Sequence, residues 1–109
     1  MASGILAQQV LTADTITEVY AAPASKISSL TVNAVTTYSG TTYVNVGVTT
    51  QSNINSLNPQ PWIEYRAPLL NEGALIERGG IVISNGQKLV AYTPSEGVIV
   101  TVYGYEEDV

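Results

Sequence analysis

The feature that most constrains the fold of this 109-residue chain is a period-two alternation of apolar and polar residues in short runs. Residues 44–48 read Val-Asn-Val-Gly-Val, and residues 30–34 read Leu-Thr-Val-Asn-Ala. Successive side chains of a β-strand point to opposite faces, so this spacing predicts strands with one buried face. The same reasoning gives about nine short strands, at residues 6–11, 16–21, 30–34, 44–48, 62–66, 75–78, 81–84, 88–92 and 98–103.

Strict alternation also predicts which side chains share a face in the run that begins at Trp62. Glu64 and Arg66 should lie on the same face as the tryptophan, and Ile63 and Tyr65 on the opposite face.

Turn-forming residues separate these runs at short intervals. Asn85-Gly86 is the strongest hairpin signal, because both residues tolerate the positive φ of a type I′ turn. Gly79-Gly80 is interpreted as a break between two strands, and residues 51–61, rich in Asn, Ser and Pro, as a functional or mobile loop. No stretch shows helical periodicity with caps. We therefore expect one all-β domain over residues 1–109, an antiparallel β-sandwich of jelly-roll or immunoglobulin-like strand order.

Composition argues against an enzyme and against a bound cofactor. The chain has no histidine and no cysteine, which removes histidine-assisted nucleophilic catalysis and thiolate chemistry. A Ser–Lys pair would need a buried lysine, yet Lys26 and Lys88 sit beside turns. Nothing in the sequence places two carboxylates across a cleft; the candidates are Glu64, Glu72, Glu77 and Glu96. The acidic run Glu106-Glu107-Asp108 lacks the spacing of a calcium loop, so we expect no metal site.

The charge pattern excludes further classes of partner. Only four Lys and Arg stand against nine Asp and Glu, for a net charge of −5, so nucleic-acid binding is not expected. The apolar runs are far shorter than the ~20 residues of a membrane span, and no signal-peptide pattern opens the chain. Charged residues make up 12% of the chain, about half the usual ~25%, so its surface is covered mainly by Ser, Thr, Asn and Gln or by neighbouring subunits. Depletion of charge at obligate interfaces favours neighbouring subunits.

The aromatic residues are the best candidates for a binding surface. The chain has seven tyrosines and one tryptophan but no phenylalanine. Tyrosine and tryptophan are favoured where one end of the side chain is buried and the other meets water or a partner. Trp62 could form such a surface with Tyr38 and Tyr43, which flank a predicted hairpin. Alternatively, Trp62 fills the core of the sandwich and the tyrosines cover its rim.

Three blocks of the sequence resemble the small β-sandwich structural proteins of tailed bacteriophages, particularly those of cyanobacterial and other aquatic phages. The first comprises Gly4-Ile5-Leu6-Ala7, Val19-Tyr20-Ala21-Ala22-Pro23-Ala24-Ser25-Lys26 and Leu30-Thr31-Val32-Asn33. The second comprises Glu64-Tyr65-Arg66-Ala67-Pro68-Leu69 and Gly73-Ala74-Leu75-Ile76-Glu77-Arg78-Gly79-Gly80-Ile81-Val82-Ile83-Ser84-Asn85-Gly86-Gln87, and the third is Val102-Tyr103-Gly104-Tyr105-Glu106-Glu107. These are strand-and-turn patterns rather than site residues. Ser25 stands where the family pattern has glycine, and residues 35–61 match least.

The resemblance implies a virion component made in the host cytoplasm, most directly a capsid decoration (cement) protein on the head surface. Its partners would be the major capsid protein and further copies of itself, as a homotrimer at local threefold positions. The alternative is a tail, fibre or baseplate component with a structural or receptor-binding role, in which Trp62 and the tyrosines stack on cell-surface glycans. The residues predicted to contact partners are Ile5, Leu6, Tyr38, Tyr43, Trp62 and Tyr65. Residues 2–6 are expected to act as an arm that adds a strand to a neighbouring subunit.

Overall fold

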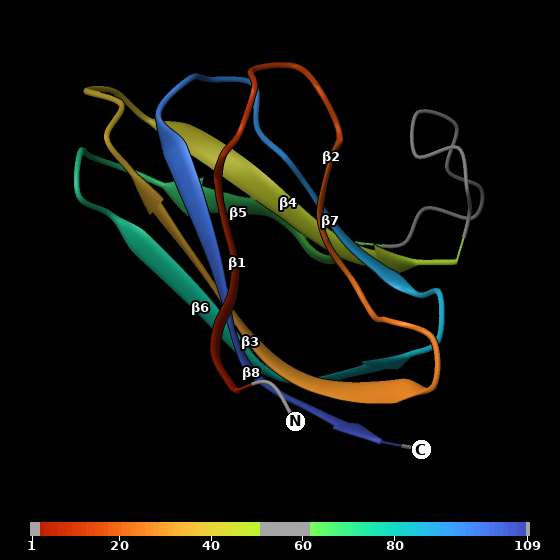
Figure 1. Ribbon diagram of the computed structural model, residues 1–109. Helices are drawn as coiled ribbons and strands as arrows, with labels where there is room; N and C mark the ends of the chain where they lie inside the picture. The colour runs from red at the N-terminus through yellow and green to blue at the C-terminus, as the bar shows by residue number, and fades with distance from the viewer. Residues whose placement is uncertain (1–2, 51–61, 109) are drawn as a thin grey trace.

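A computed structural model describes residues 3–50 and 62–108 and shows an all-β chain (Figure 1). The predicted loop at residues 51–61 lies outside the described residues. In the described part the structure has eight strands and no helix, and therefore no helix able to cross a membrane. The strands are β1 (Ser3–Val10), β2 (Thr17–Ala21), β3 (Lys26–Thr36), β4 (Thr42–Thr49), β5 (Trp62–Leu69), β6 (Leu75–Ser84), β7 (Lys88–Tyr92) and β8 (Val98–Asp108).

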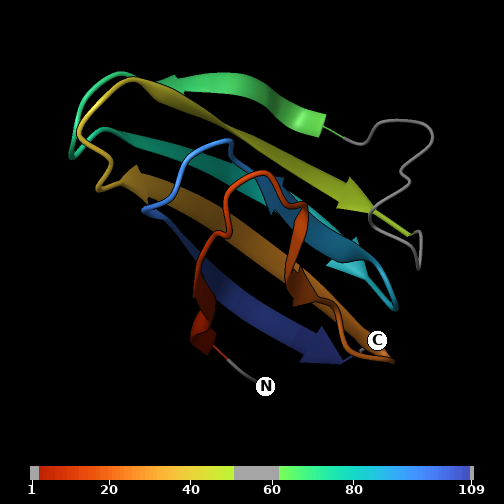
Figure 2. The ribbon, with the colours of Figure 1, turned by 90° about the horizontal axis from the view of Figure 1, so that it is seen from above.

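The strands form two four-stranded antiparallel sheets packed face to face, as Figure 2 shows. One sheet has the order β1-β8-β3-β6 and the other β2-β7-β4-β5. The first four strands pair in reverse order with the last four, as they would if the chain formed one long hairpin that then folded into two layers. The pairs are β1–β8, β2–β7, β3–β6 and β4–β5. This strand order is that of a jelly roll, which decides between the two topologies that the sequence leaves open.

The predicted alternation produces the core between the two sheets. Along β3 every second residue from Ser28 to Thr36 is buried, and the residues between them are partly exposed. Strand β8 shows the same pattern from Val98 to Val102. The apolar side chains at the centre of this core are Leu30, Val32, Ala34, Val44, Val46, Leu89, Ala91, Val98, Val100 and Val102.

The prediction of two separate strands at residues 75–78 and 81–84 is wrong, because both belong to β6. Opposite β6, Leu30 pairs with Ile81 and Val32 pairs with Arg78, so one residue of β3 faces the two glycines. The Gly79-Gly80 pair is therefore a β-bulge that keeps the strand continuous rather than a break. Gly80 has a φ of +73°, a backbone conformation that side chains with a Cβ rarely adopt.

The predicted division of β5 into two faces is wrong for Tyr65. Between the β4 residues Val44 and Val46, the opposing stretch of β5 contains one extra residue, which forms a second bulge. Tyr65 and Arg66 lie in this bulge, and Arg66 has a φ of +53°. The bulge places Tyr65 beside the same pocket as Trp62.

The strongest turn prediction, a hairpin at Asn85-Gly86, is confirmed. Asn85 and Gly86 both have positive φ, and the amide of Gln87 donates to the carbonyl of Ser84 at 3.0 Å across a two-residue hairpin. Ser25 has a φ of +62°, in the left-handed region of backbone conformation that favours glycine.

The expectation of an N-terminal arm fails for the described residues of that segment. Ser3, Gly4 and Ile5 pair with Tyr105, Gly104 and Tyr103 of the same chain, so they extend the chain's own sheet along β8.

Candidate functional site

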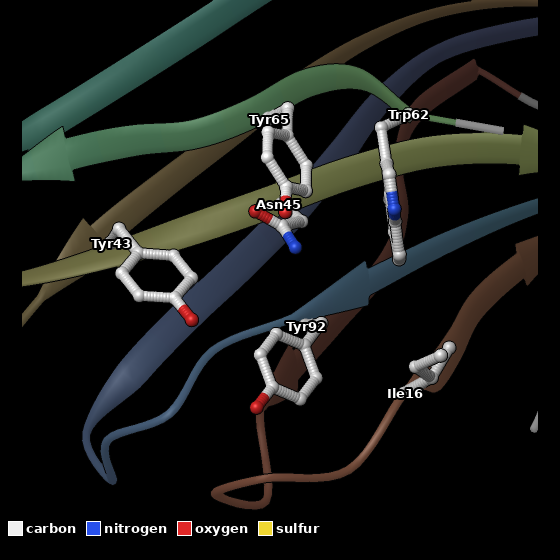
Figure 3. A pocket seen from close by; sticks show the side chains of 6 residues that line it. All are labelled: Ile16, Tyr43, Asn45, Trp62, Tyr65 and Tyr92. Carbon is white, nitrogen blue, oxygen red and sulfur yellow. The ribbon is translucent and has the colours of Figure 1, made fainter. Parts of the chain in front are cut away.

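The outer face of the β2-β7-β4-β5 sheet holds an open pocket rich in aromatic side chains (Figure 3). Its volume is about 220 Å³. The residues that line it are Ile16, Tyr43, Asn45, Trp62, Tyr65 and Tyr92.

Three strands and one connection supply these residues. Tyr43 and Asn45 point outward from β4, because the valines between and after them point into the core. Tyr92 ends β7 and is the direct cross-strand partner of Asn45. Figure 3 shows the indole of Trp62 edge-on, extending from β5 across β4, with Ile16 at the far rim just before β2.

Asn45 connects the pocket to the β5 bulge. Its side chain is 6% exposed, and its Oδ1 atom accepts a hydrogen bond from the Arg66 amide at 2.7 Å. A bulge interrupts the regular ladder of backbone hydrogen bonds, and here the asparagine side chain satisfies one of the freed donors. Asn45 thereby fixes the irregular backbone that brings Tyr65 to the pocket.

Arg66 lies at the rim of the pocket against two of its aromatic rings. The guanidinium carbon is 5.1 Å from the centre of the Tyr43 ring and 5.7 Å from that of Tyr65. Both distances fit cation–π contacts. A hydrogen bond with the Tyr65 side chain raises the pKa of Arg66 above its ordinary value. The ion pairs within the described ranges are Lys26–Asp108 and Arg78–Glu64, so Arg66 has no carboxylate partner there.

A carboxylate lies beside another of the lining residues, Tyr92. The Tyr92 hydroxyl donates to Asp14 Oδ1 at 3.0 Å, and this hydrogen bond raises the pKa of Tyr92. The rings of Tyr43 and Tyr92 are 6.5 Å apart and tilted by 37°, within the range of a favourable aromatic pair. The pocket is thus lined by aromatic side chains, with a basic group beside Tyr43 and Tyr65 and an acidic group beside Tyr92.

The structure brings together three of the six residues predicted to contact partners: Tyr43, Trp62 and Tyr65. Trp62 is half-buried in the pocket and lies outside the core cluster, which argues against its role as a core plug. Tyr38 is exposed in the β3–β4 connection, away from the pocket lining.

The other two predicted residues lie on β1 in the opposite sheet. Ile5 is exposed, and Leu6 packs against the core.

Sequence reasoning missed Ile16, Asn45 and Tyr92 as pocket residues, and Arg66 at its rim. Alternation does mark Tyr43 and Asn45 as sharing a face, since they are two residues apart on β4. Nothing in the linear sequence places Tyr92 opposite Asn45, because 47 positions separate them and only the β4–β7 register joins them.

A second surface covers the outer side of the β1-β8-β3-β6 sheet, and we name it the β8 face. It consists of the outward side chains of these four strands. Glu77 and Glu107 are its charged residues, and Glu77 accepts a hydrogen bond from the Tyr103 hydroxyl at 2.6 Å. Six large apolar side chains on it are exposed: Ile5, Val10, Ile27, Leu75, Val82 and Tyr105.

One row of apolar side chains crosses the whole β8 face. Cross-strand pairing aligns Leu75 with Val35, Val35 with Ile99, and Ile99 with Val10, so the row runs from one edge strand to the other. Leu75 is 55% exposed and Val10 is 59% exposed.

Three of the residues considered for catalysis, Glu64, Glu77 and Lys26, have structural partners. Glu64 pairs with Arg78 at 3.4 Å, and Glu77 is bonded to Tyr103. Hydrogen bonding to Asp108 raises the pKa of Lys26, whereas a lysine that acts as a base needs a lowered pKa. Over residues 3–50 and 62–108, no three acidic side chains gather in a way that could hold a metal ion.

Comparison of the chain with protein-family models, with curated proteins and with solved structures finds no match.

Proposed function

We propose that this chain is a structural protein of a tailed-phage virion, a capsid decoration protein that binds the outer surface of the major capsid lattice. The observation that carries the proposal is the β8 face, a four-stranded surface with apolar side chains on every strand and two carboxylates as its charges. Depletion of charge is typical of surfaces that become buried in stable assemblies. Contiguous exposed apolar residues also mark interaction surfaces.

Two further points support the proposal. The jelly roll is an architecture of viral capsid proteins as well as of lectins, although a fold alone does not specify a function. The sequence blocks that resemble phage structural proteins contain four of the six exposed apolar residues of the β8 face: Ile5, Leu75, Val82 and Tyr105.

Decoration would stabilise the capsid by mass action. A protein that binds only the assembled lattice lowers the free energy of that state, and disassembly must then also release the bound copies. A homotrimer at a local threefold position would present three β8 faces at once, so that individually weak contacts combine.

The test measures binding to undecorated heads of the phage that encodes this chain. Purified protein is added to the heads, and bound protein and the temperature of DNA release are followed. We expect saturable binding that raises the release temperature. Heads that bind no protein would contradict the proposal and direct the search for partners to tail proteins.

Two charge substitutions identify the surface that binds. Leu75→Lys and Val82→Lys place a cation on the β8 face at exposed positions of the edge strand β6, where a lysine is tolerated. We expect each to weaken head binding at least tenfold. The matched control is Leu70→Lys, since Leu70 is similarly exposed but lies after β5, off this face. Equal binding by all three variants would show that another surface is used.

A further inference from the structure

The structure points to a second binding activity, at the aromatic pocket on the other sheet. We infer that the pocket formed by Tyr43, Asn45, Trp62, Tyr65 and Tyr92 binds a single hexopyranose ring of a surface polysaccharide, and that Arg66 favours a hexuronic acid. This inference goes beyond capsid decoration and does not depend on it, because the pocket and the β8 face lie on different sheets.

The aromatic rings provide the stacking surface. One face of a pyranose ring presents C–H groups with partial positive charge, which are attracted to the negative face of an aromatic ring. Figure 3 shows Trp62 standing upright beside Asn45, with the tyrosine rings on the other sides of the pocket. Tyr65 is 58% exposed, so much of its surface is available to a ligand.

The polar groups match a ligand rich in hydroxyls. The hydroxyls of Tyr43 and Tyr65 can donate and accept hydrogen bonds, whereas the Tyr92 hydroxyl donates to Asp14 and can accept a hydrogen bond from a ligand. The Asn45 side chain lines the floor of the same pocket. An apolar lining with a few convergent polar groups is the usual composition of a small-molecule site. The volume of about 220 Å³ is below the ~300–1,000 Å³ of sites for drug-sized ligands, so one sugar ring is the expected occupant.

The charges at the rim select among sugars. An aromatic cluster alone would also suit a cationic ligand, but Arg66 already lies over two of the rings and would repel a second cation. A stacked guanidinium keeps its edge N–H groups available for a carboxylate. Asp14, which is hydrogen-bonded to Tyr92, would repel that carboxylate, so the ring is oriented with its acid group toward Arg66 and its hydroxyls toward Tyr92.

The test compares glucuronate with glucose, and the readout is calorimetry together with the fluorescence of Trp62, the one tryptophan of the chain. We expect saturable binding of both sugars in the millimolar range, with glucuronate about fivefold tighter, the factor that corresponds to one exposed ion pair. Absence of saturable binding for either sugar would overturn the inference.

Variants separate the parts of the site. Trp62→Ala and Tyr65→Ala should each abolish binding by calorimetry, and two variants are used so that misfolding of one, seen by circular dichroism, leaves the other as a test. Arg66→Gln should retain glucose binding and lose the preference for glucuronate. The matched control is Tyr105→Ala, which removes an exposed tyrosine from the β8 face and should bind both sugars as the unaltered protein does.

The opposite results would overturn the assignment of residues. Unchanged affinity in folded Trp62→Ala and Tyr65→Ala would exclude the pocket, and an unchanged glucuronate preference in Arg66→Gln would exclude the arginine. Trp62→Ala should still bind undecorated heads. Failure of sugar binding and failure of decoration are therefore observed separately.

Discussion

At the scale of single residues, Gly104 in β8 lies against the backbone of β3 with no room for a side chain. A Cβ atom at this position would lie 1.9 Å from the carbonyl oxygen of Ser29 on the neighbouring strand, and the φ of Gly104 is +152°. Gly80 also has a positive φ, but a Cβ there would meet no atom within 4 Å. The two positions therefore separate the effect of backbone conformation from the effect of a steric clash.

We predict that Gly104→Ala lowers the free energy of unfolding by about 3 kcal/mol or more, because backbone strain and overpacking add. Gly80→Ala should lose about 1–2 kcal/mol from backbone strain alone. Urea denaturation of both variants measures the difference. Equal losses would mean that β8 and β3 separate easily enough to admit a methyl group.

A second feature at the residue scale is the hydrogen-bond network of Tyr20. Its hydroxyl is 2.8 Å from Oγ of the fully buried Ser28 and also donates to Glu106, across the two sheets. Burial, followed by the hydrogen bond to Glu106, raises the pKa of Tyr20 to about 12. Deprotonation would remove the donor and place a second negative charge beside Glu106.

We predict that Tyr20→Phe lowers the free energy of unfolding by about 1–2 kcal/mol at neutral pH, since Ser28 and Glu106 lose a partner. The pKa of Tyr20 is higher in the folded chain than its ordinary value of 10.0, so its contribution is fully present below pH 10. That contribution is lost as pH rises from about 10 through about 12. The stability difference between Tyr20→Phe and the unaltered protein should therefore shrink over this range, as urea denaturation at each pH would show. A constant difference would contradict the shifted pKa.

At the scale of elements, β-bulges determine which side chains face the core in the edge strands β5 and β6. In β6 the extra residue shifts the phase of the alternation by one, so that Ile76 faces the core before the Gly79-Gly80 pair and Ile81 and Ile83 face it afterwards. The left-handed backbone at Gly80 is part of this bulge.

We predict that Gly80→Asn costs about 1 kcal/mol of unfolding free energy, whereas Gly80→Val costs about 2 kcal/mol or more. Asparagine enters the left-handed region with little strain, while a β-branched residue does so rarely. The site is open to solvent, so the size of the side chain should matter little. Thermal unfolding of the two variants provides the comparison, and a valine tolerated as well as asparagine would show that the bulge needs no left-handed residue.

At the scale of the whole molecule, both sheets share one core, and the strand pairs join distant parts of the chain. β1 pairs with β8, and β2 pairs with β7, so neither sheet can be completed before most of the chain is in place. Such a structure should unfold as one cooperative unit.

We predict a single unfolding transition that coincides when followed by Trp62 fluorescence and by far-ultraviolet circular dichroism. Leu89→Ala in one sheet should lower the free energy of unfolding by about 3 kcal/mol and Val100→Ala in the other by about 2 kcal/mol, because both side chains are fully buried. Both variants should keep coincident transitions. A transition at Trp62 that precedes the loss of strand structure would indicate that the two sheets unfold separately.

The sequence by itself determined the all-β class, most of the strands and, along the alternating runs at residues 30–34 and 44–48, which side chains fill the core. Alternation is a local property of the chain. The division of a strand's side chains into two faces does not depend on which strand it pairs with, so it can be predicted from the sequence. The hairpin at Asn85-Gly86 was predictable for the same reason, since its positive φ values depend on the two residues themselves.

Only the tertiary structure decided the strand order, the bulges and the composition of the pocket. A bulge is one extra residue relative to a partner strand, so it is undefined until the partner is known, and this is why Tyr65 and the Gly79-Gly80 pair were misread. The pocket joins β4, β5, β7 and the residue before β2, which meet through pairing between distant segments. The sequence of one strand does not specify which other strand it pairs with, because the backbone hydrogen bonds between strands form equally well with many partner strands.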